Sequence, residues 1–287
     1  MNVIGIIPNL TKDVNLKYTS MIINEIIRHG GEYLVTQKIA SQIGLDRGVE
    51  NEEDLLKNSD IIVCLGGDGT FLSVARMAYK YDKPILGINL GTLGFLTDIE
   101  KDDYKDVALK LLTNDLDIEE RMMLKAEIIK NKKVESVDIA LNDVVVSRIA
   151  LSRILHIKAY INDVYVDTFP GDGIIVSSPT GSTAYSLSAG GPIVEPDMNL
   201  MVVTPICPHI LYSRSFITSG DRKVKISLDE NYHNKAMVTV DGQKGVEVAS
   251  GDEIVIGKAS CTVKMVRLRK RNFFNILRSK IYYRGGL

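Results

Sequence analysis

The 287-residue sequence contains few cysteines and no apolar run of membrane-spanning length. Cys64, Cys207 and Cys261 are too few and too scattered for a disulfide framework, a C-x-x-C redox pair or a zinc site. The amino terminus has no basic segment ahead of its first apolar residues, so it does not resemble a secretion signal. We therefore expect a cytoplasmic protein that is neither exported nor embedded in a membrane.

An excess of charge of either sign is also absent. Lys and Arg number 35 and Asp and Glu number 36, a net charge of −1, so the whole chain has no electrostatic footprint for nucleic acid. Basic residues do gather after Glu253, and a solvated or salt-paired tail is the simpler interpretation of them. The four histidines show no ligand spacing, and we predict no metal site made by the protein itself.

Two common nucleotide-binding fingerprints are missing as well. The phosphate-binding pattern G-x-x-x-x-G-K-[ST] fails because five residues separate Gly251 from Gly257 and because Ala259 follows Lys258. The dinucleotide pattern G-x-G-x-x-G fails because Leu72 stands where the last glycine is required. Any phosphate site in this chain must therefore use another scheme.

The first hundred residues alternate short apolar segments with amphipathic ones. Apolar runs predict strands at 3–7, 33–36, 61–65 and 85–88, and helical spacing predicts helices at 14–28, 71–78 and 102–113. This order predicts a parallel sheet with helices on both sides, in which ligands bind beyond the carboxyl ends of the strands. We assign residues 1–100 to this Rossmann-like α/β domain.

The pattern changes after about residue 120. Short strand-like segments predict a β-rich, sandwich-like domain over 121–267; they are 125–129, 144–148, 154–161, 173–177, 201–204, 224–228, 237–240 and 253–256. Asn162-Asp163 and Asp241-Gly242 look like hairpin turns. The segment 272–283 is helical in pattern, and we expect residues 268–287 to dock back on the α/β domain.

The turn Gly66-Gly67-Asp68-Gly69-Thr70 directly follows the apolar run 61–65. Glycines let backbone N–H groups approach a phosphate closely, but the charge of Asp68 would repel phosphate unless it met a proton, a hydroxyl or a metal ion. A second glycine turn, residues 89–95, follows the next predicted strand at the same edge of the sheet. The pair predicts a site where a phosphate and a hydroxyl come together.

Residues 170–192 form the longest unusual stretch of the sequence. Eight hydroxyl side chains fall within the twelve residues 177–188, which is typical of a polar surface loop or of a ligand site. A ligand site is favoured because a short helix at 183–189 would offer free N–H groups and Tyr185 a ring for stacking. Asn142 could bond a base edge and Asp143 a ribose hydroxyl. A simple turn at the start of a strand explains the pair equally well.

The two glycine turns, Asn142-Asp143 and the stretch 172–191 resemble, in that order and at these separations, the NAD kinase family. The resemblance covers essentially the whole chain. The first turn is shared with diacylglycerol and sphingosine kinases and in part with phosphofructokinases, whereas Thr180-Gly181-Ser182-Thr183-Ala184-Tyr185 is far more specific. The family pairs an α/β domain with a β-rich domain and assembles as homodimers or homotetramers.

The resemblance implies transfer of the γ-phosphoryl group of ATP to the 2′-hydroxyl of the adenosine ribose of NAD, giving NADP and ADP. Mg²⁺ or another divalent metal ion would accompany ATP. Asp68 falls on the family's proposed proton acceptor and Gly69 on its neighbour in the NAD site. The other implied NAD contacts are Asn142, Asp143, Arg153, Asp172, Thr183, Ala184, Tyr185, Ser186, Leu187, Ser188 and Gln243, and the implied phosphate loop is Gly66, Gly67, Gly69 and Thr70. The family usually has Asn-Glu where this chain has Asn142-Asp143, a shorter acid with the same charge.

Two alternatives remain open at this point. A lipid kinase, or another small-molecule kinase, would share the first glycine turn but would need an apolar acceptor site in place of the hydroxyl-rich block. A non-catalytic NAD(P)-binding sensor would keep the dinucleotide contacts and would not need Asp68. An assay for NADP formed from Mg²⁺-ATP and NAD separates these alternatives.

Overall fold

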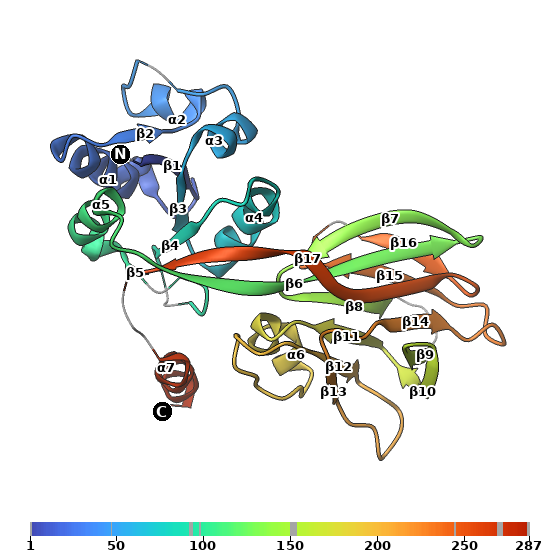
Figure 1. Cartoon of the computed structure of the whole chain (residues 1–287). Helices are drawn as coiled ribbons and strands as arrows, with labels where there is room; N and C mark the ends of the chain where they lie inside the picture. The colour runs from blue at the N-terminus through green and yellow to red at the C-terminus, as the bar shows by residue number, and fades with distance from the viewer. Residues whose placement is uncertain are drawn as a thin grey trace. The chain divides into compact units, whose positions relative to one another are not determined.

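A computed structural model describes residues 2–46, 48–91, 94–97, 99–149, 154–243, 245–268 and 272–285 of the chain. The chain forms two compact units (Figure 1). The first contains Met1–Glu120 together with Val263–Leu287, and the second contains Arg121–Thr262. The long strands β6 (Asp117–Lys130) and β17 (Glu253–Arg267) contribute residues to both units.

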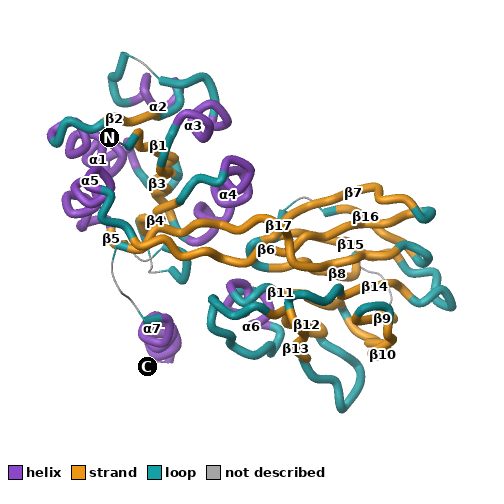
Figure 2. Tube along the Cα trace, in the orientation of Figure 1, coloured by secondary structure: helices purple, strands orange, loops and turns teal. Residues whose placement is uncertain are grey.

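The first unit is an α/β structure around a parallel sheet in the order β4-β3-β1-β2. Its elements, in chain order, are β1 (Val3–Pro8), η1 (Val14–Leu16), α1 (Lys17–Arg28), β2 (Glu32–Leu34), α2 (Gln37–Gln42), α3 (Glu52–Asn58), β3 (Ile61–Gly66), α4 (Asp68–Ala78), η2 (Tyr79–Tyr81), β4 (Ile85–Asn89), β5 (Ile99–Glu100), η3 (Lys101–Asp103), α5 (Tyr104–Thr113) and α7 (Phe273–Gly285). Among the described residues, the single turn α6 (Tyr185–Ser188) is the only α-helix of the second unit (Figure 2).

Helices cover both faces of this sheet, with α1 and α5 on one side and α3 and α4 on the other (Figure 1). Successive residues of a strand point to opposite faces, so Ile4 and Ile6 of β1 join the core formed with α1 and α5. Gly5 faces α3, where an added Cβ would lie 2.7 Å from Leu55 Cδ2. Every residue of β3 is buried, and burial raises the pKa of its Cys64 thiol to about 12, which keeps that thiol neutral.

The second unit consists of two antiparallel sheets that enclose one core. One contains β6, β7 (Lys133–Ala140), β9 (Leu155–Ile161), β10 (Val164–Gly171), β14 (Val224–Leu228) and β17; the other has the order β13 (Phe216–Ser219), β12 (Leu200–Ile206), β11 (Gly173–Ser177), β8 (Asp143–Arg148), β15 (Lys235–Val240), β16 (Val246–Ala249). The core draws residues from both sheets, for example Ile157 and Ile226 from the first and Val146 and Ile174 from the second. The prediction of a parallel α/β part followed by a sandwich-like β part is confirmed.

The two expected hairpin turns are present. Asn162 and Asp163 have φ of 47° and 64° between β9 and β10, and Asp241 and Gly242 have φ of 52° and 66° between β15 and β16. Left-handed values of this kind favour Asn, Asp and Gly. Asn162-Asp163 is a two-residue hairpin turn, whereas the connection from Val240 to Val246 is longer and Asp241-Gly242 begins it. The sequence patterns missed α2, α3, β7, β10, β13 and β16, because these elements are short or largely exposed and so carry little periodic apolar signal. Among the described residues, no helix is long and apolar enough to cross a membrane.

Candidate functional site

The turn between β3 and α4 lies at the carboxyl end of the parallel strands. Gly67 is the residue before the helix, and Asp68 is its first residue. An added Cβ on Gly66 would overlap the hydroxyl of Thr70, so only glycine allows this turn to close. Gly69 is exposed and has open space around it. The first N–H groups of α4 are therefore left at a free helix start, which favours an anion.

The carboxylate of Asp68 is held by the second glycine turn. Its Oδ2 accepts a hydrogen bond from Phe95 N at 2.8 Å. Its Oδ1 accepts from Leu96 N at 3.0 Å and from Thr97 N and Thr97 Oγ1, both at 3.2 Å. Gly94 is needed for this approach, because an added Cβ would overlap Oδ1. The N–H groups of residues 95–97, at the end of this turn and just after it, thus bind Asp68, whereas the sequence favours a ligand at this turn.

The segment after β1 supplies two residues that the sequence motifs did not reveal. Asn9 Nδ2 donates to Thr70 Oγ1 at 2.8 Å, and Asn9 Oδ1 accepts from Thr11 N and Lys12 N at 3.1 and 3.2 Å. Lys12 Nζ lies 2.7 Å from the position that a Cβ on Gly67 would take. The place of these two residues in the chain could have indicated them, because they follow β1, and the carboxyl ends of the neighbouring parallel strands β1 and β3 meet at one edge of the sheet.

Helix α7 brings a basic residue to Asp68. Lys280 Nζ lies 4.0 Å from Asp68 Oδ2 and 4.7 Å from the centre of the Phe95 ring. The rings of Phe273 and Phe95 are 6.2 Å apart at 41°. No sequence motif marked Lys280, because its partners are about two hundred residues earlier in the chain.

In the second unit, Asn142 and Asp143 lie at the start of β8 against the end of β15. The Asp241 carboxylate holds the backbone of this segment: its Oδ1 accepts from Asn142 N at 2.8 Å and from Asp143 N at 3.1 Å. Its Oδ2 accepts from Leu141 N at 2.8 Å. The Asp241 N–H in turn donates to Asp143 O at 2.9 Å. Gly181 packs on the Asn142 carbonyl so closely that a Cβ would overlap it. Asp143 is buried, and this burial, with the nearby Asp241 charge, raises the pKa of Asp143 to about 7.

This raised pKa predicts a pH-dependent cost to stability. The folded chain holds the Asp143 proton more tightly than the unfolded chain, whose value is near 3.8, so the associated stability is present below that value and is lost as the pH rises through about 7. Asp143→Asn removes the charge. We expect the melting temperature of Asp143→Asn minus that of the parent to increase from pH 5 to pH 8, because only the parent must ionise a buried carboxyl group. The increase should correspond to at most about 3 kcal/mol in the free energy of unfolding.

Differential scanning fluorimetry at the two pH values measures this shift. Asp197→Asn is the control, because Asp197 is an exposed residue of the same unit. An equal difference between Asp143→Asn and the parent at both pH values would contradict the prediction.

The hydroxyl-rich stretch folds as a 3₁₀ turn η4 (Thr180–Thr183) and a single helical turn α6 (Tyr185–Ser188). Many of its hydroxyls bond within the fold. Ser178 Oγ accepts from Gly181 N at 3.1 Å, Ser182 Oγ accepts from Val194 N at 3.1 Å, and Ser186 Oγ lies 3.1 Å from Thr204 Oγ1. Tyr185 is 46% exposed. The buried hydroxyls hold the turn, and Tyr185 presents its ring to solvent.

The remaining predicted site residues vary in their surroundings. Asp172 Oδ1 lies 2.9 Å from Arg148 Nε in an ion pair. Gln243 is an exposed residue of the turn after β15, close to Asp241 in sequence and structure. Thr183, Ala184 and Leu187 are half-buried and Ser188 is exposed. Arg153 lies outside the described residues.

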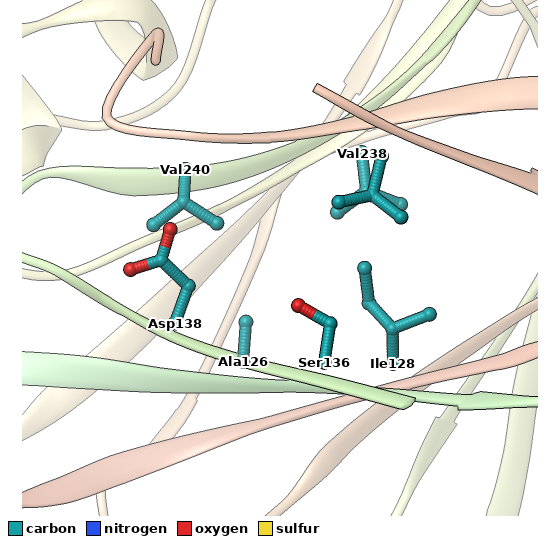
Figure 3. Close-up of a pocket in the computed structure, with 7 residues that line it drawn as sticks. Ala126, Ile128, Ser136, Asp138, Val238 and Val240 are labelled. Carbon is teal, nitrogen blue, oxygen red and sulfur yellow. The ribbon is translucent and has the colours of Figure 1, made fainter. Parts of the chain in front are cut away.

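A small cavity lies between β6, β7 and the β15–β16 pair of the β-rich unit (Figure 3). Its volume is about 20 Å³, enough for a water molecule and far too small for a nucleotide. Its walls are Ala126, Ile128, Ser136, Asp138, Val238, Val240 and Val246. A cavity of this size and lining is not a dinucleotide site.

Family comparisons agree with the two units. The profile of the ATP-NAD kinase N-terminal domain matches residues 4–116, and that of the ATP-NAD kinase C-terminal domain matches residues 141–268. The NAD kinase of Acetivibrio thermocellus is 54% identical over 282 residues, which are 98% of this chain and 98% of that protein. The NAD kinase of Ruminiclostridium cellulolyticum is 50% identical over 284 residues, 99% of each.

Solved structures show the same fold. Yeast NADH kinase complexed with NADH matches with a TM-score of 0.89 at 23% identity, over 100% of this chain and 89% of that one. An NAD kinase from Archaeoglobus fulgidus in complex with ATP matches with a TM-score of 0.75 at 26% identity, over 96% of this chain and 99% of that one. The chain therefore belongs to the NAD kinase family, and its activity is the ATP-dependent phosphorylation of NAD to NADP.

Proposed function

We propose that Asp68 holds the 2′-hydroxyl of the adenosine ribose of NAD while ATP delivers its γ-phosphoryl group to that oxygen. One observation carries this proposal: four donors from residues 95–97 orient the Asp68 carboxylate, yet its side chain remains 35% exposed. A carboxylate fixed in this way can accept a hydroxyl hydrogen bond without reorganising. Alignment of that kind is the main contribution of a protein to phosphoryl transfer.

Gly66, Gly67, Gly69 and Thr70 form the loop that receives the ATP phosphates. The free start of α4 and the open space around Gly69 support this assignment. Lys12, whose amine lies beside Gly67, adds positive charge at the same turn. The Thr70 hydroxyl accepts from Asn9 and acts mainly by bracing the loop.

Mg²⁺ would reach the site bound to ATP, as part of the substrate. The described residues contain no cluster of three or more His, Cys, Asp and Glu side chains that could hold a metal ion. Mg²⁺ is commonly bound through substrate phosphates with only one or two carboxylates, so its binding with ATP does not require such a cluster. The ion would neutralise charge on the phosphate oxygens.

The NAD contacts in the second unit comprise Asn142, Asp143, Asp172, Thr183, Ala184, Tyr185, Ser186, Leu187, Ser188 and Gln243, together with Arg153. The exposed Tyr185 ring suits stacking on a base or a nicotinamide. The hydrogen bonds from Asn142 N and Asp143 N to Asp241 fix the backbone of the pair. Within this set, the Ser186 hydroxyl already bonds Thr204, so we assign that side chain the role of supporting the turn that carries Tyr185.

We further propose that residues 1–100 and 268–287 act as the α/β domain and residues 121–267 as the NAD-binding domain. The two compact units support this division. We also propose that the protein is cytoplasmic and that it assembles as a homodimer or homotetramer. Light scattering of the purified protein measures the number of chains in the assembly.

The experiment incubates the purified protein with Mg²⁺-ATP and NAD and detects NADP with an NADP-specific dehydrogenase. We expect one NADP for each ADP formed. NAD whose adenosine ribose lacks the 2′-hydroxyl should give no phosphorylated product, because the accepting oxygen is missing. Phosphorylation of that analogue would show that another hydroxyl is the acceptor and would overturn the role given to Asp68.

A further inference from the structure

Lys280 of α7 lies close to Asp68. Its Nζ lies 4.0 Å from Asp68 Oδ2, and the two side chains are 30% and 35% exposed. At this distance the pair is a loose ion pair, longer than the 2.7–2.9 Å of a charge-assisted hydrogen bond. The Lys280 ammonium group is therefore close to the carboxylate, reachable by a ligand, and not committed to a short bond with Asp68.

The position of Lys280 is held by aromatic packing. Its Nζ lies 4.7 Å above the Phe95 ring, a favourable place for a cation. Phe273, seven residues earlier and so on the same face of α7, packs against the same ring at 6.2 Å. Phe95 also donates its backbone N–H to Asp68 Oδ2. One residue thus connects the cation to the carboxylate through its ring and its backbone.

We propose that Lys280 is a catalytic residue that donates a hydrogen bond to the γ-phosphoryl group during its transfer. This proposal rests on the role assigned to Asp68 above. A hydroxyl bound to Asp68 lies about 2.7 Å from the carboxylate, and the phosphorus it attacks lies about 3–3.5 Å further on. The oxygens of that phosphoryl group therefore come within reach of a lysine whose amine is 4.0 Å from the same carboxylate oxygen.

A bond forms between the ribose 2′-oxygen and the γ-phosphorus, and the bond from that phosphorus to the bridging oxygen of ADP breaks, with its electron pair leaving on ADP. The hydroxyl proton passes to Asp68 and from there to solvent. Lys280 keeps its protons and stabilises negative charge on the phosphoryl oxygens, and removing one such donor typically costs about 10²- to 10³-fold in kcat.

The test compares Lys280→Ala and Lys280→Arg with the matched control Arg278→Ala, which removes one charge from an exposed position on the same helix. We expect Lys280→Ala to lower kcat by about 10²- to 10³-fold, with KM for NAD within about threefold of the parent. The kcat of Lys280→Arg, and that of Lys280→Ala with added methylamine, should each be at least tenfold higher than that of Lys280→Ala alone. The kcat of Arg278→Ala should stay within threefold of the parent.

Three outcomes would overturn the proposal: Lys280→Ala within threefold of the parent, a loss equal to that of Arg278→Ala, or a loss that neither arginine nor methylamine reverses. The last would indicate lost packing on Phe95. Asp68→Asn measured in parallel separates the two claims. If kcat falls in Asp68→Asn but not in Lys280→Ala, only the role of Lys280 is refuted. If kcat falls in Lys280→Ala and is restored by arginine or methylamine, but does not fall in Asp68→Asn, only the role of Asp68 is refuted.

Discussion

Asp68→Asn is expected to lower kcat by about 10²- to 10⁴-fold, the usual cost of removing a general base, while NAD still binds. The amide has nearly the volume of the carboxylate but cannot accept a proton. It can still accept hydrogen bonds from Leu96 N and Thr97 N through its oxygen, so the 94–97 segment should keep most of its order. The loss is therefore expected in turnover and not in folding.

The measurement is the rate of NADP formation at saturating Mg²⁺-ATP and NAD, with NAD affinity determined separately by calorimetry. Asp54→Asn, an acidic residue in the first turn of α3 in the same unit, is the control for a general charge effect. Activity of Asp68→Asn within tenfold of the parent would refute the assignment. A collapse of the melting temperature would instead mean that Asp68 serves mainly to hold residues 95–97.

Gly94→Ala is expected to lower kcat by at least about 10²-fold through Asp68 and without touching a substrate. A Cβ at residue 94 would overlap Asp68 Oδ1 and also lie 2.6 Å from Thr97 Oγ1. The carboxylate or the loop must move, and a displacement of about 1 Å at a reacting group can cost 10²-fold in rate. The side chain added is only a methyl group, so its own chemistry contributes nothing.

Gly91→Ala provides the matched control, since it adds the same methyl group to the same loop at a position where no described residue lies within 4 Å. We expect Gly91→Ala to keep kcat within about threefold of the parent, because only local backbone freedom changes. A crystal structure of Gly94→Ala should show Asp68 rotated away from Leu96 N and Thr97 N. Equal activities of the two variants would mean that the position of Asp68 does not limit the reaction.

Local patterns located much of the α/β part in advance. The apolar run at 61–65 became β3, and the glycine turn after it became the start of α4, because a buried strand and a tight strand-to-helix turn both have strong local signatures. The predicted helix at 272–283 is α7, Phe273–Gly285. These features depend on neighbours within a few residues, so the sequence alone carries them.

Partners of the polar residues could not be read in the same way. The N–H groups of the second glycine turn bind Asp68, and many hydroxyls of 177–188 bond within the fold, although their composition suits a nucleotide equally well. A donor or acceptor looks the same in sequence whether its partner is a ligand or another part of the chain. Which partner it has depends on the three-dimensional neighbours, and these come from the fold.

The amino-acid sequence by itself determined the class of the fold, the place of the glycine turns at the ends of β3 and β4, and the family to which the chain belongs. Tertiary structure alone decided that Asp68 meets residues 95–97 and Lys280, and that Asp143 is buried beside Asp241, 98 residues away. Strand order and helix docking bring these groups together across long stretches of chain. Charge and burial act over a few ångströms of space and not along the sequence, so only the folded chain reveals them.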